Sequence, residues 1–157
     1  MHTGVYARHA TTAAIELCIG LEEALMTEQQ HLRRHVEDFM VKAPVFVEPW
    51  QPVAHARQLM LTHSFSFLPV FLGTWKLISE GSLARYMWSS ADWKTLLAAR
   101  IEHAAGSGLE LQDARVVTLK HEVSALLQDA ERGSPRLWLV QDDHDRLCGV
   151  LSPFELM

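Results

Sequence analysis

The chain repeats one pattern of apolar and polar residues, and an internal repeat restricts the possible folds more than any other sequence feature. Four apolar pairs are each separated by 70 residues: Val53 and Val123, Ala56 and Leu126, Met60 and Ala130, and Val70 and Val140. Ser79 recurs at Ser152, 73 residues later, because the polar turn at 142–145 makes the second copy slightly longer. The two halves are therefore expected to be one structural unit that occurs twice.

Each copy is expected to form a strand, a helix, a second strand, a turn and a third strand, and then to begin another helix. Apolar residues at helical spacing follow Val53 and Val123, and short runs rich in β-branched and aromatic residues predict the strands. The predicted strands are 43–50, 66–72 and 75–78 in the first copy, and 114–119, 136–141 and 146–152 in the second. This order predicts an α/β (α+β) fold built from two similar units.

The segments outside the repeat are expected to be helical. Apolar residues at helical spacing run through the N-terminal segment, where Gly20 is expected to divide the helix and residues 1–12 to be loosely ordered. A second helical stretch is expected to continue from residue 88 to a Gly-Ser-Gly loop at 106–108, a hinge between the units. The predicted divisions are an N-terminal helical segment 1–35, a first unit 36–90, a helical linker 91–109 and a second unit 110–157.

Composition excludes several classes of function. The net charge is -5 and basic residues are not clustered, so a nucleic-acid surface is not expected. Apolar stretches are shorter than the roughly 18 residues that span a membrane, and the N-terminus has no secretory signal pattern, so we expect no membrane partner and a cytoplasmic location. Cys18 and Cys148 have no neighbouring cysteine, which argues against a disulfide framework and against a zinc site.

No combination of residues indicates catalysis or a metal centre. The sequence has no evident Ser-His-Asp or Cys-His arrangement and no glycine-rich phosphate loop, so an enzyme is not expected. His31 and His35 have a spacing that can bind a metal, with Glu28 one turn away, but such histidines among arginines are more often solvated. The acidic turn at 142–145 lacks the glycine and the final acid of a calcium loop and is expected to be a polar hairpin.

Two stretches of sequence, one in each half, carry a resemblance to a known family. The first contains VEDFM, FLPVF and LISEGSL, and the second contains ARVVTL, RLWLVQ and GVLSPFEL. They resemble paired cystathionine-β-synthase-type (CBS) domains, the Bateman module, over residues 36–157. The resemblance implies a tandem CBS-domain pair with pseudo-two-fold symmetry, an N-terminal helical extension and a cleft at each end of the interface. Such pairs often bind AMP, ATP or S-adenosylmethionine.

The last stretch, GVLSPFEL, matches the family motif in which a hydroxyl and an acid lie three residues apart. The resemblance implies that Ser152 meets the phosphate of a nucleotide and that Glu155 accepts hydrogen bonds from the ribose hydroxyls. Serine and glutamate stand here where the family has threonine and aspartate. The residues alone allow a second interpretation, in which Ser152 and Glu155 form only a capping pair for a helix that begins at Pro153.

The first copy of the motif departs further from the family pattern. Lys76 stands where the family has glycine, and Ser79 and Ser82 take the positions of the hydroxyl and the acid. We therefore expect the cleft that contains Ser152 and Glu155 to be the one that binds a ligand. The resemblance assigns further ligand contacts to Pro135, Arg136, Leu137 and Val116, and in the first half to Phe65, Ser66 and Phe67. Core packing is the alternative for the two phenylalanines, and a solvated position is the alternative for Arg136.

Two functions of different class follow. One is a regulatory module that senses an AMP-like adenosine ligand, requires no other cofactor and acts on a separate regulated protein. The other is a degenerate CBS pair that serves as a dimerisation or protein-interaction scaffold without a ligand. A homodimer is expected in both cases, through Leu83, Tyr86, Met87, Trp88, Phe154, Leu156 and Met157, with Leu21, Leu25, Leu32 and Val36 of the N-terminal segment.

Overall fold

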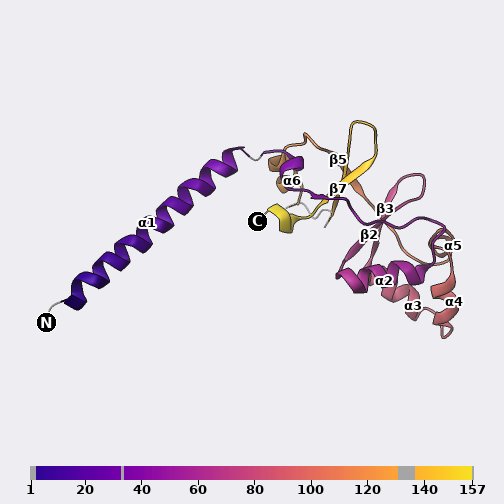
Figure 1. The fold of residues 1–157 in the computed structure, drawn as a ribbon. Coiled ribbons are helices and arrows are strands. Elements are labelled where there is room, and N and C mark those ends of the chain that lie inside the picture. Colours follow the sequence, from indigo (N-terminus) through magenta and orange to yellow (C-terminus); the bar gives the residue numbers. More distant parts are fainter. Residues whose placement is uncertain (1–2, 33, 131–136, 157) are drawn as a thin grey trace.

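The computed structural model describes residues 3–32, 34–130 and 137–156 and shows two α/β units behind a long N-terminal helix (Figure 1). Helix α1 (Thr3–Leu32) extends away from both units, and its side chains from Thr11 to Glu28 are exposed. It passes through Gly20 without a break, so the predicted division is wrong, and it begins at Thr3 within the segment predicted to be loosely ordered. One glycine costs a helix only about 1 kcal/mol relative to alanine, and good helix formers surround Gly20.

The order of elements in the two units confirms the predicted repeat and the α+β class. The first unit contains α2 (Val53–His63), β2 (Phe67–Phe71), β3 (Trp75–Ser79) and α3 (Glu80–Trp88). The second unit contains β5 (Arg115–Thr118), α6 (Val123–Ala130), β6 (Trp138–Gln141), β7 (Leu147–Leu151) and η2 (Pro153–Leu156), a short 3-10 helix. In each unit a hairpin of two antiparallel strands leads into a helical turn at the motif serine.

The strand predicted at 43–50 is not formed. A two-residue strand, β1 (Val41–Lys42), lies before it, and Val47 makes only an isolated parallel bridge to Val70. Pro44 and Pro49 have no amide hydrogen to donate to a neighbouring strand, which interrupts a continuous ladder. The apolar pattern indicated that residues 43–50 contribute to the core, but it did not show that they form no continuous pairing with another strand.

The helical stretch predicted from residue 88 onward is divided, and this part of the prediction is wrong. Two short helices, α4 (Trp93–Ala98) and α5 (Ile101–Gly106), follow α3 in place of one continuous helix. A separate 3-10 turn, η1 (Val36–Asp38), precedes β1 near the start of the first unit. The side chain of Asp92 accepts hydrogen bonds from the backbone amide and the hydroxyl of Thr95. Asp92 is therefore the N-cap of α4, a position where aspartate favours the start of a new helix over the continuation of an old one.

Each β-sheet is completed by a short strand from the other half of the chain. Strand β1 pairs with β7 in the sheet ordered β1-β7-β6-β5, and β4 (Gln112–Asp113) pairs with β3 in the sheet ordered β2-β3-β4. Val41 lies opposite Val150, and Lys76 lies opposite Asp113. Strands β5 and β6 are parallel, and the other pairs in these sheets are antiparallel. Backbone hydrogen bonds therefore join the units at both crossing points.

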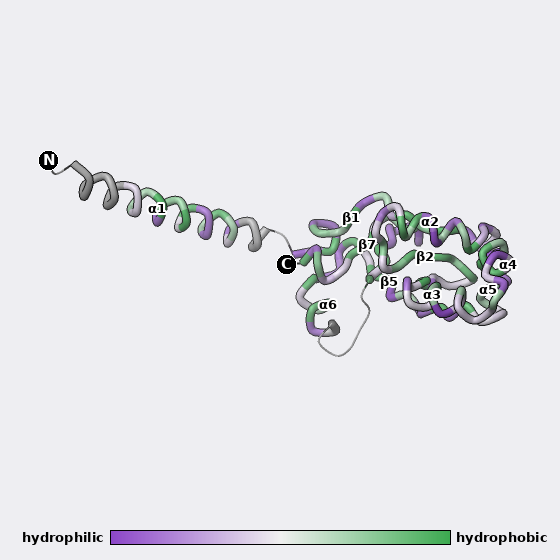
Figure 2. The backbone as a smooth tube through the Cα atoms, turned by 90° about the horizontal axis from the view of Figure 1, so that it is seen from below, coloured by the Kyte–Doolittle hydropathy of each residue, from purple (hydrophilic) through white to green (hydrophobic). Residues whose placement is uncertain are grey.

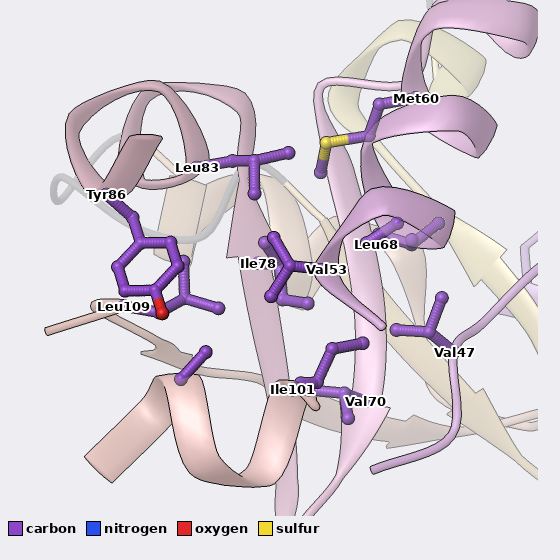
Figure 3. Packing of buried hydrophobic residues seen from close by; sticks show 12 residues of the cluster. Val47, Val53, Met60, Leu68, Val70, Ile78, Leu83, Tyr86, Ile101 and Leu109 are labelled. Carbon is purple, nitrogen blue, oxygen red and sulfur yellow. The ribbon is translucent and has the colours of Figure 1, made fainter. Parts of the chain in front are cut away.

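The hydrophobic cores follow this exchange of strands. The first core, shown in Figure 3, contains Val47, Val53, Ala56, Met60, Leu68, Val70, Ile78, Leu83, Tyr86, Ile101, Ala104 and Leu109. The second contains Val36, Val117, Val123, Leu126, Trp138, Val140 and Leu151. Ile101 and Ala104 of the predicted linker thus pack in the first core, and Val36 packs in the second. In Figure 2 the backbone of β2 has the colour of hydrophobic residues, and the coloured part of α1 contains both hydrophobic and hydrophilic residues. The sequence-based boundaries stay a prediction.

Gly149 allows the exchanged strand to approach β7 closely. It lies opposite Lys42, and a Cβ atom placed on Gly149 would lie 2.5 Å from Met40 Sδ and 3.2 Å from the Val41 carbonyl oxygen. The Met40 side chain could turn away from such an atom, but the carbonyl is fixed by the backbone of β1. A side chain at this position would therefore require Met40 to move and would crowd the Val41 carbonyl oxygen.

Replacement of Gly149 by alanine is expected to lower the free energy of unfolding by about 1–3 kcal/mol, the usual cost of an over-packed site. Urea denaturation measures this difference. Gly81→Ala is the matched control, because nothing lies within 4 Å of a Cβ atom at Gly81 and alanine is the better helix former in α3. Equal stability of the Gly149→Ala and unmodified proteins would contradict the close approach of β1.

Candidate ligand-binding cleft

A cavity of about 910 Å³ lies where the two units meet. The first half of the chain lines it with residues 64–67 and 79–81, and the second half with Gln112, Leu137 and residues 152–155. The Glu80 amide donates a hydrogen bond of 3.0 Å to the Ser66 carbonyl, which connects the two main first-unit segments of the wall. The volume is within the range of sites that hold small molecules.

Ser152 and Glu155 lie together on the second-unit wall and hydrogen bond to each other. The Ser152 amide donates to Glu155 Oε2 at 2.7 Å, and the Ser152 hydroxyl donates to the same oxygen. The Phe154 amide donates to Ser152 Oγ at 3.3 Å. The capping pair that the sequence allowed is therefore present, and it holds a carboxylate and a hydroxyl at the cavity wall.

Ser79 and four other residues expected near a ligand also line the cavity. Those four come just before or at the start of the buried strands. They are Phe65, Ser66, Phe67 and Leu137. Phe65 packs against the first core as well, and its ring stacks on His63 with centroids 5.1 Å apart. The two interpretations of this phenylalanine, core packing and contact with a ligand, are thus compatible, because one side of it meets the core while another meets the cavity.

Two expected contacts are not among the described lining residues. Ser82 is 3% exposed and lies behind the wall, and Val116 is 41% exposed on β5. Pro135 and Arg136 lie outside the described residues. Ser82 is therefore buried next to the lining residue Gly81, and Val116 is a partly exposed residue of β5 that does not line the cavity.

Sequence reasoning did not assign Ser64, Glu80, Gln112 or Phe154 to the cleft, although all four line it. Glu80 and Phe154 are next to or near the motif serines, so the motif could have indicated them. Gln112 reaches the cavity because β4 pairs with β3, with Gln112 opposite Leu77. That pairing joins distant parts of the sequence, and no local signal predicts it.

The acidic hairpin is held by its own hydrogen bonds. Asp142 accepts from the amides of His144 and Arg146 and, at 2.7 Å, from the Arg146 guanidinium. The hydrogen bonds from Arg146 lower the pKa of Asp142 from 3.8 to about 2. Among the residues whose side chains the structure describes, no three His, Cys, Asp or Glu residues are grouped to hold a metal ion. No helix in the described part of the chain has the length and apolar character to cross a membrane.

Comparison with known proteins finds the fold in solved structures only. No protein-family model matches the sequence, and no curated protein matches it significantly. A CBS domain-containing protein of unknown function from Bacillus anthracis has a TM-score of 0.62 at 16% identity, over 78% of this chain and 88% of that one. CBSX2 in complex with AMP has a TM-score of 0.61 at 19% identity, over 79% and 93% of the two chains.

The cytosolic domain of the Mg²⁺ channel MgtE, in complex with ATP, has a TM-score of 0.58 at 13% identity, over 78% of this chain and 47% of that one. The chain has the fold of a tandem CBS-domain pair. The resemblance seen in the sequence is thereby confirmed for the fold, which by itself does not determine what a protein binds.

In this CBS pair the first copy of the motif is held by internal hydrogen bonds. Ser79 Oγ accepts from the Ser82 amide, and Ser82 Oγ accepts from the Ser79 amide, both at 3.1 Å. Ser82 Oγ also donates to the Ser79 carbonyl at 2.9 Å. These bonds form a reciprocal capping box at the start of α3, and they occupy the hydroxyl that stands in the position of the family acid.

Lys76 also has a structural partner in this CBS pair. It forms an ion pair with Asp113, the residue opposite it in the β3–β4 pairing. The equivalent position in the second motif is Gly149, where β1 leaves little room for a side chain. The first unit thus accommodates a lysine, through its ion pair with Asp113, at a position where the second unit has glycine.

The charges on the cavity wall affect which ligands of a CBS pair can fit. Glu80 and Glu155 are carboxylates, and the described lining residues include no lysine or arginine. Carboxylates accept hydrogen bonds from ligand hydroxyls but repel phosphates. The described wall therefore favours neutral or cationic ligands over polyphosphates.

Ser82→Ala is expected to lower the free energy of unfolding by about 1 kcal/mol, because it removes the hydrogen bond that the Ser79 amide donates to Ser82 Oγ in the capping box. Chemical denaturation provides the measurement. Ser124→Ala, at an exposed serine of α6, is the matched control and is expected to stay within about 0.5 kcal/mol of the unmodified protein. If both variants were equally stable, the capping box would not contribute to the stability of α3.

Proposed function

We propose that this CBS pair is a regulatory module that binds an AMP-like adenosine ligand in the cleft between its units. The observation that carries the proposal is the cavity that Ser79 of one unit lines together with Ser152 and Glu155 of the other. Two structures of the same fold support it, since CBSX2 contains AMP and the MgtE domain contains ATP. We propose no catalytic role.

In the proposed complex Glu155 accepts hydrogen bonds from the ribose, and Ser152 faces the 5′ substituent. Both bonds that Glu155 accepts from Ser152 end on Oε2. A ribose hydroxyl would be accepted by Oε1, or by Oε2 after the Ser152 hydroxyl turns toward the ligand. Phe65, Phe67 and Leu137 would supply apolar contacts for the base.

The other predicted contacts divide into two groups. Ser79 lines the cavity and stays in the proposed site, whereas Ser82 and Val116 are left out because they are absent from the described lining. Pro135 and Arg136 remain predicted contacts outside the described residues. A basic side chain from that segment would moderate the acidic character of the wall.

The proposed regulatory effect is a change in the relative position of the two units. A ligand that contacts both units shifts them only as far as its affinities for the two arrangements differ. Because the exchanged strands join the sheets, a movement of one unit is transmitted to the other through β1 and β4. We propose that a separate regulated protein receives this signal.

A thermal-shift panel of adenosine, AMP, ADP, ATP, S-adenosylmethionine and GTP tests the ligand proposal. A ligand at about 100 times its Kd stabilises the folded state by roughly 2.7 kcal/mol. For a chain of this size the melting temperature is expected to rise by about 5–10 °C. Adenosine, AMP or S-adenosylmethionine is expected to give a larger shift than ATP or GTP, because of the carboxylates on the wall.

Two variants control this panel. Glu155→Gln is expected to lose most of the shift, because the neutral side chain can still accept a bond from Ser152 but binds the ribose more weakly. Glu16→Gln, at an exposed residue of α1 far from the cleft, is expected to keep the full shift (Figure 1). The absence of any shift at millimolar concentration of every compound would contradict the proposal.

A second function, the scaffold without a ligand, is favoured by the first copy of the motif. Ser79 and Ser82 form a capping box, and Lys76 forms an ion pair with Asp113. These groups stabilise the fold whether or not a nucleotide is present. A stable dimer that responds to none of the compounds in the panel would support this function over the first.

We propose a homodimer for both functions, with a smaller interface than the sequence indicated. Leu83 and Tyr86 are buried in the first core and Val36 in the second, so these three residues cannot contact a second chain. Met157 and the side chain of Leu32 lie outside the described parts, and Met87 and Leu156 are half-buried. The exposed candidates that remain are Trp88, Phe154, Leu21 and Leu25.

Light scattering at tens of micromolar is expected to give twice the chain mass of 17.8 kDa. Trp88 and Phe154 are 89% and 75% exposed, and a glutamate at either position is expected to weaken the dimer by placing a charge in an apolar contact. Trp50→Glu is the control at another exposed tryptophan outside the proposed interface. A mass of 17.8 kDa for the unmodified protein would rule out the dimer.

A further inference from the structure

A second cavity, of about 410 Å³, adjoins the first between helices α2 and α3. Ser64, Phe65 and Glu80 line both cavities and therefore form their common boundary. Through these shared residues the lined surface of the first cavity extends into the second. None of the sequence motifs indicated this extension, because α2 and α3 meet only in the folded first unit.

The two cavities differ in chemistry. The first is bordered by serines and two carboxylates, whereas the second is lined largely by Met60, Leu61, Leu83, Ala84 and Met87. Met60 and Leu83 are buried members of the first core and lie toward the same end of it in Figure 3. Leu61 is 64% exposed, so its apolar surface meets water when the cavity is empty. A bound apolar group would remove that surface from water.

The charged residues lie at the rim of the second cavity. Arg57 and Glu80 are exposed, in contrast to the buried Met60 and Leu83. Glu80 stands at the boundary of the two cavities, where its carboxylate would repel a phosphate chain that passes from one to the other. An uncharged chain meets no such repulsion.

We propose that the ligand is an adenosine derivative with an uncharged apolar substituent, and that this substituent occupies the second cavity. The proposal rests on the nucleoside site proposed above and specifies the chemical class of its ligand. The nucleoside lies at Ser152 and Glu155, and the substituent passes Phe65 to contact Leu83 and Met87. Each buried methylene is expected to tighten binding about threefold to fourfold.

Isothermal titration calorimetry of the full chain tests this with two series of compounds. One contains adenosine and its 5′-methylthio, 5′-butylthio and 5′-hexylthio derivatives, and the other contains adenosines with N6-methyl, N6-butyl and N6-hexyl groups. In one series Kd is expected to fall about threefold to fourfold per methylene until the cavity is filled. Because the base is proposed to contact Phe65, the N6 series is expected to gain affinity, and a gain in the 5′ series instead would reverse the proposed orientation of the nucleoside.

A cavity-filling variant distinguishes binding of the alkyl substituent in the second cavity from nonspecific hydrophobic binding of long alkyl groups. Ala84→Phe places a ring in the second cavity from an exposed position of α3 and is expected to abolish the gain with chain length. Its affinity for adenosine is expected to stay unchanged, because Ala84 does not line the first cavity. Ala125→Phe, at an exposed alanine of α6 that lines neither cavity, is expected to keep the gain.

The outcomes distinguish this inference from the proposed function. If adenosine binds but neither series gains affinity with length, the inference is wrong and the nucleoside site stands. A gain that persists in Ala84→Phe overturns the inference in the same way, because the chain then lies elsewhere. If adenosine and all its derivatives fail to bind, the nucleoside site and the inference fail together.

Discussion

The pairing of β1 with β7 is the interaction on which the rest of this CBS pair depends. It brings the start of the repeat onto the sheet of the second unit, so Val36 packs in the second core although it precedes the first unit. The reciprocal pairing of β4 with β3 brings Gln112 to the cavity wall. Backbone hydrogen bonds beside these crossings, from the Val36 amide to the His121 carbonyl and from the Ala114 amide to the Trp75 carbonyl, also join the two units that line the cavity.

The contacts at these crossings differ between the two motif copies. At the first crossing β7 presents Gly149, where Met40 and the Val41 carbonyl would crowd a side chain. At the second crossing β3 presents Lys76, which reaches Asp113. A residue that departs from the family pattern therefore need not indicate that ligand binding has been lost, because the neighbouring strand also restricts which side chains fit at that position.

The two walls of the cleft also use their motif residues differently. Ser79 and Ser82 satisfy each other, and Ser82 is buried, so this pair mainly stabilises the start of α3. Ser152 and Glu155 satisfy each other at the cavity wall, and η2 is only a short 3-10 turn. A short turn has few hydrogen bonds of its own, so it can exchange a capping bond for a ligand bond at small cost. This difference is the physical reason for proposing that a ligand binds at the second-unit wall.

The sequence by itself determined the order of elements, the repeat and the serine-acid pairs, because hydrophobic periodicity and helix capping act between residues close together in the chain. Of the residues that line the cavity, it indicated Ser152, Glu155 and Leu137. It wrongly predicted a strand at 43–50 and did not predict that a new helix begins after Asp92. Only the tertiary structure decided which strands exchange, why a side chain at Gly149 would be crowded, and which side chains share a cavity. These features depend on contacts between residues far apart in the sequence, such as Val41 with Val150 and Lys76 with Asp113, and local sequence patterns do not indicate such contacts.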